Sequence, residues 1–293
     1  MRKARTGKLK LLCVVCHPAD AIDGAGGTLC QHAARGDQVT VVVCTHGVDT
    51  HDLRRNDRVR FGGRGRVTDP VTARDRKEAE VVAGMKLLGV TDVRFLRFAD
   101  ELLTVSPKLI EALAAVMAEV QPHLMITHNP TENAGLADIG HADSAQAALK
   151  AQYLANTQRF LRRPPGRKFP AQIFFLTMNG QTTRLTAEGS RFGNVLIDIS
   201  DVIERKVRAL DCLASQYYPG LVARKVLEDV NGQMGLHWRL SYAESFQTYF
   251  PESYRYLPAN PYLLEFAATS ARERARRLRL IVPFIKPPTA RTR

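Results

Sequence analysis

Two side chains that can bind a metal ion follow the first apolar run of the chain. His17 and Asp20 come directly after residues 11–16, a run typical of a buried strand. A neutral imidazole and a carboxylate, three residues apart at a strand end, can share one divalent ion. Ala19 stands between them, where a metal hydrolase would need a base. The spacing therefore predicts a metal site, and Ala19 raises the question of whether the chain performs the chemistry of such a site.

Three further histidines are expected near the same place. His46 and His128 each stand at the end of a predicted strand, and His141 begins the helix after the second of them. In open α/β sheets, ligands bind beyond the carboxyl ends of the strands, so these side chains should converge there. His17, Asp20 and His141 then form a two-histidine, one-carboxylate set, which in catalytic zinc sites leaves one position open for water.

The elements that must position these residues alternate between short apolar runs and amphipathic segments, which predicts βαβ units. The expected strands are residues 10–16, 39–45, 93–96, 124–128, 173–177 and 195–199, and the expected helices are 27–35, 74–88, 107–120, 141–154 and 201–215. Residues 45–74, rich in Arg, Gly and Asp, are expected to form a long irregular connection. The predicted fold is a Rossmann-like α/β fold, with a mostly parallel sheet and helices on both faces.

Length and composition fit one large domain with an extension. A chain of 293 residues with 45% hydrophobic residues can bury a sizeable core. We expect the Rossmann-like core over residues 1–200 and a C-terminal helix and extension, packed on that core, over 201–293, with a basic tail from about 272. No apolar run approaches the roughly 20 residues that a membrane-spanning helix needs.

The cysteines favour a cytoplasmic protein. Their number, 5, is odd and fits reduced thiols better than a disulfide framework. Cys13 and Cys16 have the spacing of a redox or zinc pair, but residues three apart on a strand point to opposite faces of the sheet. We therefore expect two core thiols.

The net charge of +13 favours a polyanionic partner. No zinc-finger spacing or RNP-like motif accompanies this charge, which disfavours nucleic acid, and a solvated basic surface is the simpler interpretation. The sequence leaves open whether the chain forms an oligomer.

A cluster of glycines follows the His17 motif. Gly24, Gly26 and Gly27 suggest a dinucleotide-binding fingerprint, but Leu29 holds the position of its third glycine. The glycines fit better with a helix that approaches the sheet closely. The chain has no Gly-x-Ser-x-Gly motif, which argues against an α/β-hydrolase.

Several short motifs coincide with those of one enzyme family. The most specific is His17-Pro18-Ala19-Asp20 with Gly26-Gly27, against a family motif His-Pro-Asp-Asp followed by a Gly-Gly helix start. Weaker matches are Thr45-His46-Gly47, Leu87-Leu88-Gly89-Val90, Phe95-Leu96-Arg97-Phe98-Ala99-Asp100, Ile126-Thr127-His128 and Tyr242-Ala243-Glu244-Ser245-Phe246. Over about residues 8–250, the chain resembles the PIG-L/LmbE family of zinc-dependent N-acetylglucosaminyl deacetylases.

The resemblance implies a small-molecule substrate, an acylated amino sugar or its glycoside, and a bound Zn²⁺ or another divalent metal. It implies His17, Asp20 and His141 as the metal ligands. A second alignment puts Ser144 at the third ligand position and His141 at an auxiliary polar site.

The remaining implied roles concern catalysis and substrate binding. His128 or Asp138 would assist the oxyanion or the leaving amine. The residues implied to contact the substrate are Asp100, His46 and Arg76, with Arg74 as the alternative to Arg76.

Ala19 departs from the family motif. The resemblance places the general base of the deacetylases, an Asp, at this position, and a positioned base contributes about 10²–10⁴-fold to the rate. The chain should therefore bind metal and substrate and turn over very slowly. Either it is a natural loss-of-base form, or a deliberate Asp→Ala change traps a substrate. The alternative functions are a non-catalytic sugar-binding pseudoenzyme and, with less support, a polyanion-binding protein.

Overall fold

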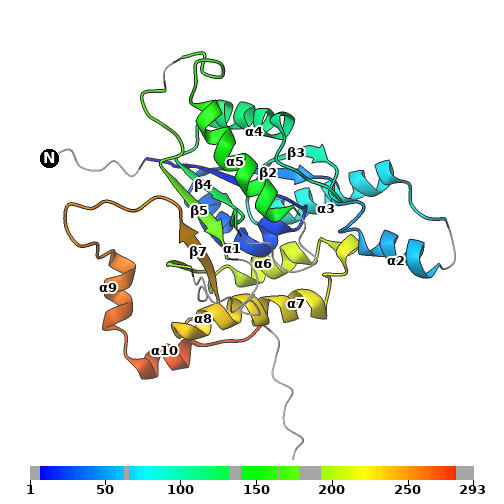
Figure 1. Cartoon of the computed structure of the whole chain (residues 1–293). Helices are drawn as coiled ribbons and strands as arrows, with labels where there is room; N and C mark the ends of the chain where they lie inside the picture. Colours follow the sequence, from blue (N-terminus) through cyan, green and yellow to red (C-terminus); the bar gives the residue numbers. More distant parts are fainter. Residues whose placement is uncertain (1–6, 63–65, 132–139, 164, 178–192, 282–293) are drawn as a thin grey trace, which may run out of the picture.

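The computed structural model of the chain describes residues 7–62, 66–131, 140–163, 165–177 and 193–281. Its centre is a seven-stranded sheet in the order β3-β2-β1-β4-β5-β7-β6 (Figure 1). The strands are β1 (Lys10–Val15), β2 (Gln38–Thr45), β3 (Asp92–Phe98), β4 (Leu124–Thr127), β5 (Gln172–Leu176), β6 (Val195–Asp198) and β7 (Ala243–Thr248). Neighbours among β1 to β5 pair in parallel, and β7 runs antiparallel to β5 and β6. The expected α/β fold is confirmed.

Helices cover both faces of the sheet (Figure 1). On one face lie α1 (Asp20–Ala34), α3 (Pro70–Leu87), α6 (Ile203–Leu210) and α7 (Leu221–Leu227), and on the other α4 (Pro107–Val120) and α5 (His141–Ala155). Alternate residues of β1 supply the two cores. Cys13 belongs to the first core and Cys16, just after β1, to the second, and both are free thiols, as expected.

Helix α1 begins at Asp20, earlier than the expected start at residue 27. The glycines therefore lie inside the helix rather than before it, because packing overrides their low helix propensity. A Cβ on Gly27 would lie 2.6 Å from Cγ2 of Ile199, closer than side chains can approach. Gly27 thus allows α1 to lie directly against the segment that follows β6, which confirms the close approach expected from the sequence.

The expected irregular connection contains a helix, α2 (Leu53–Phe61). Its hydrophobic pattern is weak, but the side chain of Asp52 accepts a hydrogen bond from the backbone N–H of Arg55 and caps its first turn. Asp69 caps α3 in the same way, and Pro70 occupies the first position of that helix. Capping residues, more than periodicity, start both helices.

A buried ion pair joins the C-terminal part of the chain to α1. Lys206 on α6 and Glu244 on β7 are fully buried, with 2.8 Å between Nζ and Oε1. The two carboxylate oxygens of Glu244 accept the backbone N–H groups of Gly27 and Thr28, at 2.8 and 2.7 Å. Lys206 in turn donates to the backbone oxygen of Asp23, at 2.6 Å. The helix that begins with Asp20 is thereby fixed to the sheet.

The C-terminal part of the chain adds short elements. They are η1 (Ala214–Gln216), η2 (Glu228–Gly232), α8 (Gln233–His237), α9 (Pro261–Ala268) and α10 (Ala271–Arg277). We call residues 249–281, which follow β7 and carry α9 and α10, the C-terminal arm (orange in Figure 1). Because β7 pairs inside the sheet, the part after residue 200 contributes to the core layer, and the expected domain boundary stays a prediction. Within the described ranges, no helix has both the length and the apolarity to cross a membrane.

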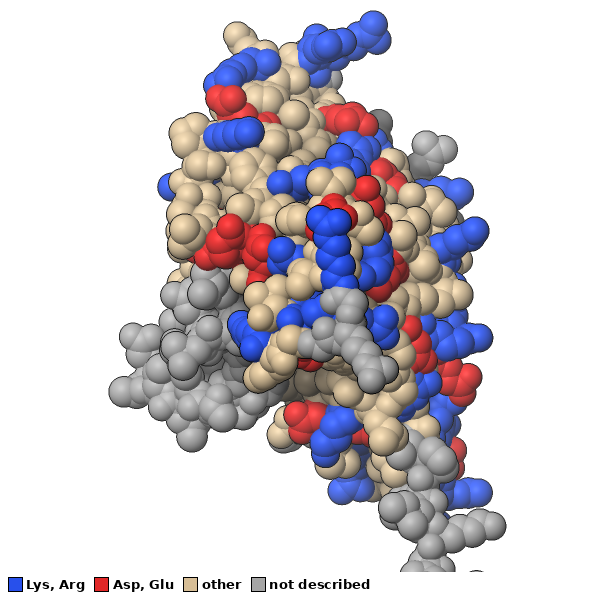
Figure 2. Space-filling model, turned by 90° about the vertical axis from the view of Figure 1, so that its right-hand side faces the viewer, with Lys and Arg blue, Asp and Glu red and all other residues tan. Residues whose placement is uncertain are grey.

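The basic charge is spread among acidic groups. Figure 2 shows the face that carries α2 and α7, where Lys and Arg side chains alternate with Asp and Glu. Several arginines of the chain are paired, as in the contacts of Arg97 with Glu78 and of Arg224 with Asp211. This mixed surface fits the solvated basic surface expected from the composition.

Candidate metal centre

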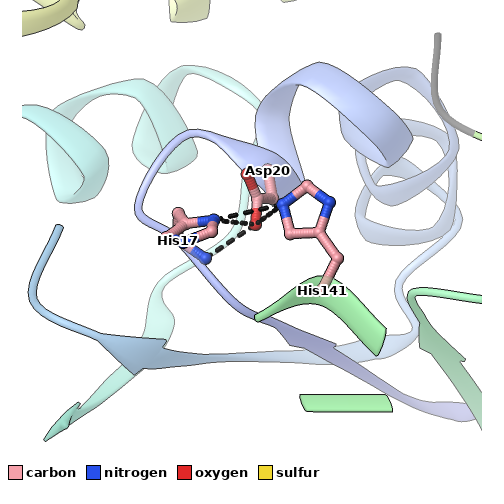
Figure 3. A group of neighbouring side chains, drawn as sticks. All are labelled: His17, Asp20 and His141. Carbon is pink, nitrogen blue, oxygen red and sulfur yellow. Dashed lines mark hydrogen bonds and ion pairs between the residues drawn. The ribbon is translucent and has the colours of Figure 1, made fainter. Parts of the chain in front are cut away.

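The carboxyl edge of the sheet brings together three of the expected site residues. His17 follows β1, Asp20 is the first residue of α1, and His141 is the first residue of α5. Figure 3 shows the three side chains pointing toward one another. All three residues are buried, and their ligand atoms lie within 4.8 Å of one another.

The spacing of these atoms fits a tetrahedral metal site. His17 Nδ1 lies 3.4 Å and His141 Nε2 3.3 Å from Asp20 Oδ2, and the two nitrogens are 3.1 Å apart. Ligands about 2.0–2.1 Å from a tetrahedral zinc ion lie about 3.3–3.4 Å from one another. Two histidines and one carboxylate are also a donor set of catalytic zinc sites, and such sites bind other divalent ions too. The residues present therefore fit the metal ion that the sequence implies.

Asp20 is held by its neighbours as an anion. Its Oδ2 accepts the backbone N–H of His17 at 2.6 Å and lies 3.0 Å from Nε2 of His128. Burial by itself would raise the pKa of this carboxyl group. The imidazoles of His141 and His17, with the hydrogen bond to His128, nevertheless hold that pKa well below its usual range. A deprotonated carboxylate is the form that binds a cation.

His128 packs directly on the ligand set. Its ring stacks on that of His141, with 3.9 Å between centroids and 12° between planes. Its Nε2 lies 3.1 Å from the backbone N of Cys16 and also contacts the carboxylate of Asp20. In the tautomer without a proton on Nε2, this nitrogen accepts the N–H of Cys16. In the tautomer with a proton there, it donates to Asp20. Burial, followed by the neighbouring His141, lowers the pKa of His128 to about 4. The imidazole is therefore neutral and able to exchange a proton or a hydrogen bond beside the site.

His51 also contacts the ligand set, although no sequence motif pointed to it. Its ring stacks on that of His17, with 3.8 Å between centroids. Burial and the nearby His17 lower the pKa of His51 to about 3. The buried ammonium group of Lys77 donates to the backbone oxygen of His51 at 2.9 Å, and burial lowers its pKa to about 8. His51 lies in the segment expected to be irregular, and the only signal for it was its position shortly after His46.

His46 and Asp100 form a pair at the ends of β2 and β3. His46 Nδ1 lies 2.9 Å from Asp100 Oδ1, and Thr50 donates to Asp100 through its backbone N–H at 2.7 Å and through its hydroxyl. Burial would raise the pKa of Asp100, but the hydrogen bonds from His46 and Thr50 lower it. Asp100 is fully buried and holds the loop that carries His51. With Asp49, the pair is a second group of metal-capable side chains. A contact of His46 or Asp100 with substrate stays a prediction.

The other expected residues lie as follows. Arg76 pairs with the buried Asp52 at the start of α2, and its Nε is buried without a hydrogen-bond partner in the part of the chain that the structure describes. Ser144 donates through its hydroxyl to the backbone oxygen of His141 at 2.8 Å, whereas the imidazole of His141 contacts Asp20. Asp138 lies outside the described residues. Their roles stay predictions.

Ala19 is the N-cap residue of α1. It is 3% exposed and packs in the apolar core, and it has no side-chain cap bond. A methyl group cannot accept a proton, so position 19 itself offers no base between the two ligands that flank it.

The fold and the buried two-histidine, one-carboxylate set define an α/β protein with a candidate mononuclear metal centre. Residues 12–151 match the family model described as PIG-L, GlcNAc-PI de-N-acetylase. This part of the chain is therefore similar to the PIG-L family, in agreement with the resemblance that the sequence motifs had indicated.

Individual relatives differ in name and in coverage. The 1D-myo-inositol 2-acetamido-2-deoxy-alpha-D-glucopyranoside deacetylase of Streptomyces avermitilis is 32% identical over 179 residues, 52% of this chain. The alignment covers 55% of that deacetylase, so the chain spans about half the length of this relative. The 4-oxalmesaconate hydratase of Pseudomonas putida is 24% identical over 257 residues, 85% of this chain and 93% of the hydratase.

A solved structure shows the same fold. The 4-carboxy-2-hydroxymuconate hydratase from Pseudomonas putida superposes with a TM-score of 0.70 at 21% identity. The superposition covers 85% of this chain and 100% of that protein. At this identity the likeness supports the architecture of the sheet and its helices.

Proposed function

We propose that this chain binds Zn²⁺ or another divalent ion through His17, Asp20 and His141. We also propose that the site is built to hydrolyse the amide of an N-acylated amino sugar or its glycoside. The observation that carries the proposal is the 3.1–3.4 Å spacing of the three ligand atoms. The match to a deacetylase of an acetamido sugar supports the choice of reaction.

The ion, when bound, would polarise the amide carbonyl and lower the pKa of a water molecule. The chain's own residues would orient the substrate and move protons. His128, neutral and stacked on His141, is the group we assign to hydrogen-bond the developing oxyanion or to protonate the leaving amine. Asp138 is proposed to share this task. The residues proposed to contact the sugar are His46, Asp100 and Arg76.

We propose that the chain hydrolyses such amides very slowly, because Ala19 occupies the position of the general base. A positioned general base is worth about 10²–10⁴-fold, and alanine supplies none. Metal and sugar binding do not require that base, because the ligands are His17, Asp20 and His141. A non-catalytic sugar-binding protein with the same site is therefore the alternative within this proposal.

Ala19→Asp tests the deacetylase proposal. The variant should release acetate from N-acetylglucosaminyl substrates about 10²–10⁴-fold faster than the unaltered chain. Ala19→Asn is the matched control, since it has nearly the same size and no basic carboxylate. Adding His17→Ala to Ala19→Asp should abolish the gain, because one metal ligand is removed.

The outcome separates the two versions of the proposal. If no acylated amino sugar or related amide is hydrolysed faster by Ala19→Asp, the deacetylase proposal is wrong. If the unaltered chain and Ala19→Asp both bind the sugar and neither hydrolyses it, the result supports the sugar-binding alternative.

A hydratase is the second candidate function. The observation that favours it is coverage, because the match to the Pseudomonas putida hydratase spans 85% of this chain while the deacetylase match spans 52%. The name of that relative's substrate denotes a carboxylate, and the net charge of +13 favours anionic substrates.

Parallel assays distinguish the two reactions. Hydration of an unsaturated polycarboxylate removes a conjugated double bond. The reaction can therefore be measured as a loss of ultraviolet absorbance. Absorbance loss that depends on His17 and His141, with no amide hydrolysis by Ala19→Asp, would support the hydratase. Amide hydrolysis without absorbance loss would reject it.

We also propose a cytoplasmic location, supported by five free cysteines. The partner in this proposal is a small molecule. The mixed charge of the face in Figure 2 does not favour a nucleic-acid stripe.

A further inference from the structure

A cavity of about 450 Å³ lies between the C-terminal arm and the body of the protein. Helices α9 and α10 contribute to one wall, and the end of β6 with the residues after it contributes to the other. The lining shares no residue with the metal centre. Pockets for small organic ligands measure about 300–1,000 Å³, so the space is large enough for more than an inorganic ion.

Guanidinium groups outnumber carboxylates in the lining. The charged lining residues are Arg239, Arg274, Arg277 and Arg279 against Asp198, Asp201 and Glu265. Asp198 already accepts hydrogen bonds from the hydroxyls of Ser200 and Tyr262, at 2.6 and 2.8 Å. Asp201 lies 3.6 Å from Arg279. These two carboxylates are engaged within the protein, and Arg277 is likewise paired with Glu273. By count, the arginines of the lining exceed its carboxylates by one, so the lining keeps a small net positive charge.

Two of the arginines keep donors without a partner. The guanidinium of Arg274 lies over the ring of Phe266, 4.7 Å from its centroid, and donates to the backbone oxygen of Phe266 at 3.0 Å. The Nε of Arg274 is buried, and no described residue accepts its hydrogen. The side chain of Arg239 likewise has no ion pair or hydrogen bond with the described residues. Protein atoms close that Nε off from solvent, so a ligand in the cavity would instead meet Nη2 of Arg274, which has no hydrogen-bond partner among the described residues.

From this cavity and its unpaired donors we infer a binding site for a small polyhydroxylated anion, of the class of sugar phosphates or sugar acids. The guanidinium groups of Arg239 and Arg274 present paired N–H donors that match a phosphate or a carboxylate. Glu265, whose carboxylate has no partner among the described residues, accepts hydroxyl groups of the ligand. A bare ion would leave most of the volume unfilled.

A ligand bound at this site would contact both the C-terminal arm and the body of the protein and so stabilise their packing. Helices α9 and α10 contain no buried residue, so little apolar packing holds them. A ligand between Arg274 on the arm and Arg239 on the body adds charge-assisted hydrogen bonds across the gap. Occupancy should therefore slow amide hydrogen exchange in both helices.

Calorimetric titration with glucose 6-phosphate and with gluconate tests the inference. Glucose is the neutral control, and inorganic phosphate is the control for the ion alone. Arg274→Leu should weaken binding of both anionic sugars about ten-fold or more. Arg272→Leu is the matched control, since it makes the same charge change on α10 at an exposed residue outside the lining. His17→Ala should bind as the unaltered protein does, which separates this cavity from the metal centre.

Each result supports or overturns the inference. Arg239→Leu is a second test in case Arg274→Leu loosens the arm, because Arg239 is an exposed residue of the body. Unchanged affinity in both variants would overturn the site, as would loss of binding in His17→Ala or no binding of either sugar at millimolar concentration. Inorganic phosphate that binds as tightly as glucose 6-phosphate would reduce the site to an adventitious ion only. Selective binding of the anionic sugars with protection of α9 and α10 would support it.

Discussion

Replacing Lys206 by methionine should destabilise the fold strongly, because the buried carboxylate of Glu244 then lacks its cation. Both side chains are fully buried, with 2.8 Å between the charged atoms. Lys206 also satisfies two further acceptors, the backbone oxygen of Asp23 and the side-chain oxygen of Asn231, at 2.6 and 2.9 Å. Removing one partner of a buried ion pair costs about 3–5 kcal/mol. Since methionine has a similar length and leaves little cavity, we expect Lys206→Met to lower the free energy of unfolding by about this amount.

Urea unfolding followed by circular dichroism measures the effect. The double variant Lys206→Met, Glu244→Gln should lose less than the sum of the single losses, by about 0.5–3 kcal/mol, because the residues contact each other. Arg159→Met is the matched control, because it removes a cation from an ion pair with Glu111 in which both side chains are exposed. Exposed pairs are worth about 0–1 kcal/mol. If Lys206→Met costs no more than Arg159→Met, burial does not determine the strength of this pair and the reasoning is refuted.

Three more outcomes follow from the structure. Elemental analysis should find that His141→Ala loses stoichiometric zinc while Ser144→Ala retains it, and the reverse would support Ser144 as the third ligand. Gly27→Ala should lower stability by about 1–3 kcal/mol in thermal unfolding, because its Cβ would lie 2.6 Å from Ile199, and Ile199→Ala in the same chain should relieve part of the loss. The hydrogen bond to Asp100 raises the pKa of His46 in the folded protein. The stability that the protonated imidazole contributes is therefore complete below about pH 6.5, the pKa of an unfolded histidine, and is lost as the pH rises through the raised pKa. His46→Gln should therefore lower the free energy of unfolding more at pH 5 than at pH 9 in denaturant titrations, and equal losses would contradict this assignment.

Local patterns predicted most of the elements in the parallel part of the sheet. The helix at Pro107–Val120 has the expected bounds, because Pro at its first position and a clear apolar period mark it. The start of α1 was predicted too late, because Gly24, Gly26 and Gly27 have low helix propensity and their packing partners are distant in sequence. Helix α2 was missed because its nine residues carry little apolar periodicity.

Part of the candidate site was likewise predictable from local sequence, and part was not. His17 and Asp20 were recognisable because a strand end places both side chains within three residues of each other. His51 and Lys77 were not, because their contacts with the site depend on how the loop after β2 folds back against His17.

The sequence by itself determined the alternation of strands and helices in the parallel part of the sheet, apart from α2. It also determined the metal-binding residue types at the strand ends and the absence of a base at Ala19. These features depend on residue type and on spacing within a few positions. Only the tertiary structure decided that His17, Asp20 and His141 meet within 4.8 Å, and that Glu244 holds α1 across more than two hundred residues of chain. Such contacts follow from the pairing of distant strands and from close packing, which bring together atoms that no local pattern relates.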